Sequence, residues 1–181
     1  MDSIAVVPYN PEWPRRFEAE RALLERVLAP WLEGGVEHIG STAIPGIAAK
    51  PIVDMIAGVA DLEEARAAHG PLEAEGYLSE PHRPEIAHHF AKPALELSVR
   101  IFGLHLTEPS SSLWRERLAF RNALRADRSL AAEYEAMKLR LASRHGADIQ
   151  AYTNGKRDFV HRVLVAAGVD FSWRAGRLPH G

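Results

Sequence analysis

The stretch that decides the fold is VEHIGSTAIPGIAAKPIVDMIAGV, residues 36–59. It places a small turn, Gly40-Ser41, after a short apolar strand, and a single carboxylate, Asp54, inside a second apolar run. A run that is apolar at almost every position from 51 to 59 is typical of a strand covered on both faces. The backbone N–H groups of a tight Gly-Ser turn bind phosphate, and a nearby carboxylate can hold the Mg²⁺ that accompanies phosphate. The pattern therefore predicts a nucleotide site.

The segments before and after this stretch show helical patterns. Residues 13–32 repeat apolar side chains at helical spacing, and we expect the glycine pair at 34–35 to end that helix. Residues 61–75 predict a second helix, which a Gly-Pro break at 70–71 divides in two.

The second half of the chain begins with a strand and continues as helices. Residues 77–89 are rich in Pro and His and predict an irregular loop or a hairpin connection, with His88 and His89 as loop residues. Residues 95–106 alternate as a strand, and Gly103 predicts a bulge that would change the side-chain parity before His105. Three helices are expected at 110–124, 129–145 and 148–167.

Length and composition indicate one globular domain. With 181 residues, 46% apolar and 25% charged, we expect residues 1–181 to form a single domain with a mobile tail at 170–181. The net charge of −2 argues against a broad nucleic-acid surface, and the absence of cysteine excludes disulfides, thiolate zinc sites and a cysteine nucleophile. No apolar run is long enough to span a membrane and no signal-peptide pattern follows Met1, so we expect a cytoplasmic protein.

Each central feature has a structural alternative. Gly40-Ser41 could be an ordinary strand-to-helix turn in which Ser41 or Thr42 caps a helix. Asp54 could be a salt-bridged aspartate at the end of a strand. We expect a functional role for Asp54, because a carboxylate among Ile, Val, Met and Ala side chains is costly unless it is paired, hydrogen-bonded or metal-bound.

Histidines and lysines supply further candidates. His38 and His105 lie in the strands expected on either side of the site, where an imidazole can bind metal, move a proton or contact phosphate, or can simply bond to backbone. Lys138 and Lys156 lie on separate helices that could pack side by side and neutralise a triphosphate, although solvent-exposed helix surface is the usual place for lysine.

Residues 38–54, HIGSTAIPGIAAKPIVD, resemble the signature of the GrpB family, whose fold belongs to the nucleotidyltransferase superfamily. The resemblance implies an α+β fold, with a nucleotidyltransferase-like mixed β-sheet flanked by helices and a helical C-terminal third. It extends over roughly residues 6–161. It also includes Val7-Pro8-Tyr9-Asn10-Pro11-Glu12-Trp13-Pro14, Leu104-His105-Leu106, Trp114, Leu118-Ala119-Phe120-Arg121, Tyr134, Lys138, Ala151-Tyr152-Thr153 and Lys156.

The resemblance further implies a magnesium-dependent nucleotidyltransferase-like enzyme. Its substrates would be a nucleoside triphosphate, which we expect to be ATP, and a small-molecule acceptor. Asp54, His105 and Lys156 would be catalytic, and Asp54 with Glu96 would bind Mg²⁺. The residues expected to bind the nucleotide and its phosphates are His38, Gly40, Ser41, Thr42, Lys50, Arg121, Lys138 and Tyr152.

Three positions depart from the family pattern. Active nucleotidyltransferases usually carry two acids, spaced Asp-x-Asp or Asp-x-Glu, but here Ile56 stands in the second place, so Glu96, or less favourably Glu37, would complete the pair. Gly103 replaces the first histidine of a His-x-His pair, and Asn122 replaces an aspartate. Two alternatives therefore stay open. One is a degenerate accessory domain that binds nucleotide or another anion, and the other is a different ATP-dependent activation reaction on the same fold.

Overall fold

A five-stranded mixed sheet organises the computed structural model, which describes residues 5–80, 84–94, 100–146 and 148–170. The strand order is β1-β2-β5-β4-β3, with β2 and β5 parallel and the other neighbours antiparallel. The strands are β1 (Leu32–Ile39), β2 (Val53–Val59), β3 (Leu78–Glu80), β4 (His88–Pro93) and β5 (Arg100–Thr107).

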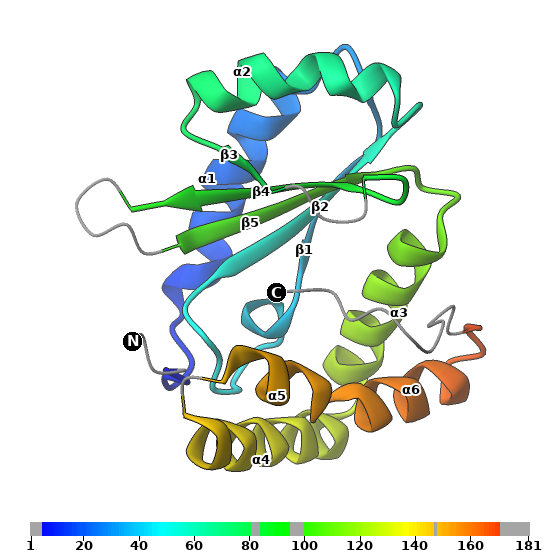
Figure 1. Ribbon diagram of the computed structural model, residues 1–181. Helices are drawn as coiled ribbons and strands as arrows, with labels where there is room; N and C mark the ends of the chain where they lie inside the picture. The colour runs from blue at the N-terminus through cyan, green and yellow to red at the C-terminus, as the bar shows by residue number, and fades with distance from the viewer. Residues whose placement is uncertain (1–4, 81–83, 95–99, 147, 171–181) are drawn as a thin grey trace.

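Helices lie behind, above and below this sheet in the view of Figure 1: α1 crosses behind the strands, α2 lies above them, and α3 to α6 gather below. This arrangement confirms the expected α+β class with a helical C-terminal third. The helical elements are α1 (Glu12–Val27), η1 (Ser41–Ala43), η2 (Glu64–Ala68), α2 (His69–Ala74), α3 (Ser112–Ala126), α4 (Arg128–His145), α5 (Ile149–Asn154) and α6 (Arg157–Ala166).

The two faces of the sheet have different roles because side chains alternate along each strand. Met55 on β2 and Leu104 on β5 are fully buried and pack in one core with residues of α1, η2 and α2, including Trp13 and Leu72. Asp54 is the neighbour of Met55 and pairs with Gly103, the neighbour of Leu104, so it projects from the other face.

A second core joins the β1–β2 connection to the helical third. Ile44 and Ile47, which follow η1, pack with Leu124 of α3, Tyr134 of α4 and Phe159 of α6. The turn after β1 is therefore held between the sheet and the C-terminal helices, which fixes its position next to Asp54.

Several of the expected boundaries are wrong. The break expected at 70–71 lies earlier, between η2 and α2, because α2 begins at His69 and continues through Gly70 and Pro71. The glycine pair at 34–35 does not end the first helix. Helix α1 ends at Val27, and β1 already begins at Leu32. Gly34 instead allows a close approach, since a Cβ atom there would lie 2.7 Å from Cγ of Pro109 and 3.2 Å from Cα of Gly58. The apolar periodicity predicts a helix as far as residue 32, because periodicity alone does not show where the chain turns back to enter a strand.

The helix expected over 148–167 is two helices, α5 and α6. Gly155 separates them and packs against Leu141 of α4, where a Cβ atom would lie 3.1 Å from Leu141 Cδ1 and closer still to Cδ2. His88 and His89, expected in a loop, belong to β4, which forms a hairpin with β3. The tail from 171 lies outside the described residues.

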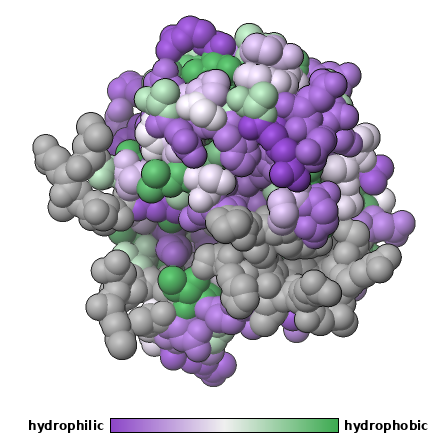
Figure 2. All heavy atoms as spheres, turned by 45° about the horizontal axis from the view of Figure 1, so that its top comes forward, coloured by the Kyte–Doolittle hydropathy of each residue, from purple (hydrophilic) through white to green (hydrophobic). Residues whose placement is uncertain are grey.

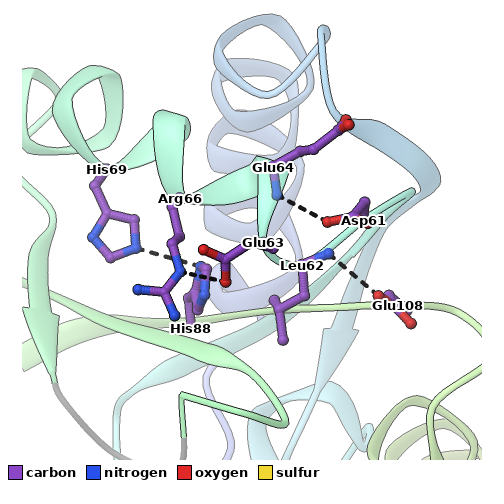
Figure 3. A network of polar contacts seen from close by, with 8 residues as sticks. All are labelled: Asp61, Leu62, Glu63, Glu64, Arg66, His69, His88 and Glu108. Carbon is purple, nitrogen blue, oxygen red and sulfur yellow. Dashed lines mark hydrogen bonds and ion pairs between the residues drawn. The ribbon is translucent and has the colours of Figure 1, made fainter.

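Polar contacts fix the segment between β2 and α2 (Figure 3). The N–H of Leu62 donates to Oε1 of Glu108 at 3.3 Å, which joins this segment to the end of β5. Nε2 of His69 lies 3.4 Å from Nδ1 of His88. Burial lowers the pKa of His88 from its ordinary value, and the nearby His69 and Arg66 lower it further.

The face shown in Figure 2 is mainly hydrophilic, and its hydrophobic side chains form small separate groups. Within the ranges that the structure describes, no helix has both the length and the apolar character that a membrane-spanning segment needs.

Candidate functional site

Asp54 lies between two glycines that approach its carboxylate closely. It pairs with Ile39, the residue before Gly40, and on its other side with Gly103. A Cβ atom at Gly40 would lie 3.0 Å from Oδ2 of Asp54, and one at Gly103 would lie 2.5 Å from Oδ1. Gly40 also has φ 70° and ψ −171°, a conformation open almost only to glycine. The Gly40-Ser41 turn and Asp54 are therefore immediate neighbours.

Gly103 has this close-approach role in place of the expected bulge. The pairing of β2 with β5 runs without a shift from Val53–Phe102 to Gly58–Thr107. The prediction of a bulge at Gly103 is wrong. An isolated glycine in a strand can mark either a bulge or a close approach of another group, and here it marks a close approach. A side chain at 103 would also meet the guanidinium of Arg100.

Four cations surround the Asp54 carboxylate. Arg100 forms an ion pair with it, NH2 to Oδ1, at 3.8 Å, and Lys50, Arg117 and Lys156 lie within electrostatic range. About a third of the side chain, 34%, reaches solvent, yet the surrounding protein desolvates the carboxylate strongly. This desolvation raises the pKa of Asp54 from its ordinary value, and the four cations oppose the increase.

Lys156 is the cation most affected by this environment. It lies at the junction of α5 and α6, and its Nζ is 4.4 Å from the centre of the Tyr152 ring. Burial, together with Lys50 and Arg117, lowers the pKa of Lys156 to about 8, while Asp54 acts in the opposite direction. A lysine that is poised near neutral pH next to other cations is ready to receive an anion.

Lys138 of α4 has a buried ammonium with a structural partner. Nζ donates to the carbonyl of Ala48 and lies 4.8 Å from the centre of the Tyr134 ring. Burial and the nearby Lys156 lower the pKa of Lys138 to about 8. The sequence-based expectation that Lys138 and Lys156 pack close together agrees with this arrangement.

The ring of Tyr134 connects the turn to the helical third, since it packs with Ile44 and Ile47 after η1. Burial raises the pKa of Tyr134, so its hydroxyl group is protonated and neutral at physiological pH. Tyr152, which we expected to contact a nucleotide, is only 3% exposed and packs under Lys156.

Three of the expected phosphate-binding residues are not part of this group. His38 is stacked on Phe17 of α1, with ring centres 4.7 Å apart, and its Nε2 lies 3.0 Å from Oγ1 of Thr42. Thr42 Oγ1 donates to the carbonyl of Ile52. Arg121 pairs with Glu37 and donates to the carbonyl of His38 at 3.0 Å. Alternation along β1 turns His38 to the Met55 face, away from Asp54, while Thr42 and Arg121 are engaged by the partners just named.

The imidazole of His105 lies on the Asp54 face, two residues beyond Gly103, and pairs with His89 of β4. The two rings meet edge to face with centres 4.6 Å apart. Its catalytic role stays a prediction.

The described residues do not fit a two-metal centre. No three histidine or acidic side chains within those ranges are grouped so that they could hold a metal ion. Ile56 is fully buried, Glu37 is engaged by Arg121, and Glu96 lies outside the described residues. Two carboxylates therefore belong to the group among the described residues: Asp54, beside the turn, and Glu80, which pairs with Arg100 at 3.2 Å.

Sequence reasoning assigned no role to Arg117, and it indicated Tyr134 only as part of the family resemblance. One signal was available: Arg117, Arg121 and Arg125 recur at every fourth position, which forms a basic stripe along α3. Nothing in the sequence showed that this stripe crosses the turn after β1.

Comparisons with known proteins agree with this architecture. The family model described as GrpB protein matches residues 3–165. The glutamate-rich protein GrpB of Alkalihalophilus pseudofirmus is 33% identical over 164 residues, which cover 89% of this chain and 94% of that protein. A UPF0157 protein of Deinococcus radiodurans is 35% identical over 167 residues, covering 92% and 82%. A dephospho-CoA kinase of Mycolicibacterium paratuberculosis is 30% identical over 179 residues, but the match covers only 42% of its length.

Solved structures show the same fold. The crystal structure of GrpB from Enterococcus faecalis aligns with a TM-score of 0.79 at 29% identity, covering 90% of this chain and 96% of that one. The GLD-2/RNP-8 complex aligns with a TM-score of 0.56 at 14% identity, covering 87% and 61%, which is a likeness of fold alone. From the family model and these relatives, the chain belongs to the GrpB protein family.

Proposed function

We propose that this chain is a nucleotidyltransferase-like protein that binds the polyphosphate of a nucleoside triphosphate, by expectation ATP, beside Asp54. The observation that carries the proposal is the excess of cations near the turn. The charges of Lys50, Arg100, Arg117 and Lys156 all act on Asp54, and among the described residues only Arg100 has a second carboxylate partner, Glu80. A polyphosphate would complement this charge. A cytoplasmic location, where nucleoside triphosphates are abundant, belongs to the same proposal.

The residues divide the binding task by their chemistry. Gly40 keeps the backbone of the turn close to Asp54, so the N–H groups that follow can approach a phosphate without a side chain in the way. Lys156 and Lys50, both with pKa values lowered by burial, would gain most from an anion that restores their preference for the charged form. Arg117 extends the positive region from α3.

Nucleotidyl transfer is the reaction that we propose for the bound nucleotide. An acceptor oxygen would form a bond to the α-phosphorus, the bond from that phosphorus to the bridging oxygen would break, and pyrophosphate would leave with the electron pair. The cations would stabilise the charge that develops on the leaving group. His105, on the same face as Asp54, would take the proton of the acceptor.

One observation favours a second candidate, nucleotide binding without turnover. Nucleotidyl transfer by two metal ions needs bridging carboxylates, and the described residues include no group of three acidic or histidine side chains that could hold a metal ion. Because the residues present do not fit a two-metal centre, we assign no step to Mg²⁺. A protein that binds ATP here but releases no pyrophosphate would have this second function.

Isothermal titration of ATP into the full chain, with and without Mg²⁺, tests the site. We expect saturable binding that Lys156→Met weakens by about tenfold or more, since a charged hydrogen bond contributes about 1–3 kcal/mol. Arg144→Met is the matched control, because Arg144 is an exposed cation in the last turn of α4. Equal loss in both variants would mean non-specific charge attraction, and no loss in Lys156→Met would remove that lysine from the site.

Turnover is measured separately as pyrophosphate release from ATP across a panel of hydroxyl, amine and phosphate acceptors. Release that His105→Gln abolishes while ATP affinity persists supports the transferase. Binding with no release across the panel supports the non-catalytic candidate.

A further inference from the structure

A cavity of about 400 Å³ lies along the outer edge of β1, one strand away from Asp54. It is bounded by α1, by the turn after β1 and by α3. This volume lies within the range of about 300–1,000 Å³ that is typical of small-molecule sites. The residues around Asp54 do not line it, so the proposed nucleotide site does not explain it.

The cavity has mixed walls, with an apolar and partly aromatic share. Tyr9, Phe17 of α1, Val36 of β1 and Pro45 after the turn supply that share. Phe17 and Val36 are almost fully buried and belong to the main core, so these walls are fixed by packing. A flat or ring-bearing ligand suits such walls.

Two arginines of the α3 stripe mark the polar end. Arg121, only 8% exposed, is engaged by Glu37 and by the carbonyl of His38. Arg125 donates from Nε to the carbonyl of Ala43 at 2.8 Å, which fixes the plane of its guanidinium. Among the described residues Arg125 makes no other hydrogen bond. Because Arg125 lines the cavity, the N–H groups of its two terminal nitrogens are available to a ligand there.

The charges of the cavity favour an anion. Its ionised side chains are Arg21, Arg121, Arg125, Glu18 and Glu37, an excess of one positive charge. His38 adds none at neutral pH, because burial first, and then Arg125 and Arg121, lower its pKa to about 4. Burial and the neighbouring Arg121 also lower the pKa of Arg125, and an anion beside both guanidinium groups would relieve that repulsion.

We propose that this cavity is a second ligand site, which takes a small organic anion with one carboxylate or phosphate group on a ring-bearing apolar body. The acidic group is held by Arg125 and Arg121, and the ring lies between Tyr9, Phe17 and Val36. The ligand also contacts Thr42 and Ala43 of η1, whose first residue is Ser41. The three-residue turn η1 thus borders both sites, so a ligand in the cavity can change the position of the turn at the nucleotide site.

The test is a titration of the full chain with phenyl phosphate, benzoate, inorganic phosphate and neutral benzyl alcohol, followed by backbone amide shifts in NMR. We expect saturable binding of phenyl phosphate or benzoate below about 10 mM, clearly weaker binding of inorganic phosphate and none of benzyl alcohol. The comparison of phenyl phosphate with benzoate identifies the acidic group. Shifts should centre on residues 36–38, 42–45 and 121–125.

Variants identify the anchor. Arg125→Met should weaken binding by about tenfold or more, whereas Arg125→Lys, which keeps the charge, should retain most of it. Arg115→Met is the matched control, because Arg115 is an exposed arginine on the same helix. Far-UV circular dichroism and the thermal midpoint of each variant establish that it is folded. If Arg125→Met does not fold, the amide shifts and the affinities of the four compounds for the unsubstituted protein still test the proposal.

Three results would overturn the proposal: no saturation by either aromatic anion, equal affinity in folded Arg125→Met, or shifts confined to residues near Ser41, Asp54 and Lys156. The last result would place the anion in the nucleotide site instead. Asp54→Asn separates the two proposals, since it should change ATP affinity and leave binding of the aromatic anion within about twofold.

Discussion

Asp54 lies directly opposite Gly103 in the parallel pair of β2 and β5, and a Cβ atom at position 103 would be 2.5 Å from its Oδ1. The bare backbone of β5 therefore leaves the space that the carboxylate occupies. The absence of a side chain at 103, more than the motif around Gly40, determines where the acid can lie.

Gly103→Ala tests this relationship. The atoms that a methyl group would meet are the ends of two side chains, Asp54 and Arg100, which can move. We therefore expect a modest loss in the free energy of unfolding, about 1–2 kcal/mol, together with a clear loss of ATP affinity because the carboxylate is displaced. Urea unfolding and calorimetry measure the two effects.

Gly70→Ala is the control, since a Cβ atom at Gly70 meets nothing within 4 Å and the position is helical. The stability of that variant should change by less than about 1 kcal/mol, because the higher helix propensity of alanine is opposed by Pro71, which disfavours a helical residue with a Cβ before it. If Gly103→Ala behaves like the control in both measurements, the close approach at 103 has no consequence and this account of Asp54 is wrong.

The pH dependence of ATP affinity should reveal Lys156. The pKa of Lys156 is lowered to about 8, and its charged form binds phosphate. Affinity should therefore be highest below about pH 8 and fall as the pH rises through that value, because the free protein must then take up protons to bind. Calorimetry at several pH values in buffers of different ionisation enthalpy would detect this uptake. Constant affinity from about pH 7 to pH 9.5 would contradict the assignment.

Substitution of Lys138 should reduce stability, and substitution of Lys156 should reduce ATP affinity. Lys138 is almost fully buried and donates to the carbonyl of Ala48, while Glu135 accepts from the N–H of the same residue. Lys138→Met leaves that carbonyl without its donor, so we expect a loss of about 1–3 kcal/mol in the free energy of unfolding. Lys156→Met should mainly reduce ATP affinity. The reverse result would exchange the two roles.

Acid sensitivity should depend on His38. Its pKa is lowered from the ordinary value of 6.5 to about 4 because the ring is buried next to two arginines. The folded state thus binds fewer protons than the unfolded state between these values. The stability is fully present above pH 6.5 and is lost as the pH falls toward 4, by about 3 kcal/mol in total.

His38→Gln removes this titration and should flatten the fall in stability across that interval, although His88, whose pKa is also lowered, will keep part of it. Denaturant unfolding at a series of pH values measures the slope. An unchanged slope in His38→Gln would mean that burial of His38 does not contribute to acid sensitivity.

Much of the fold could be predicted from the sequence, because local patterns determined it. The apolar run at 51–59 became the buried strand β2, and the Gly40-Ser41 turn lies next to Asp54. Helices α3 and α4 lie close to their expected bounds, since Ser111 and Asp127 cap them as local side-chain acceptors. These features depend on neighbours in the chain.

The parts that could not be predicted depend on distant partners. His38 and Asp54 lie on strands that the sequence identified, but the pairing register decides that they face opposite ways. Arg117 and Tyr134 reach the site only because α3 and α4 pack on the turn, and no local signal encodes that packing. The same dependence explains why Gly103 was read as a bulge.

The most direct test of the central claim is a crystal structure of the full chain soaked with a non-hydrolysable ATP analogue. The account predicts that the triphosphate lies against the backbone amides that follow Gly40, with Nζ of Lys156 within hydrogen-bond distance of a phosphate oxygen. A triphosphate bound elsewhere on the surface, or an empty site at millimolar analogue, would contradict it.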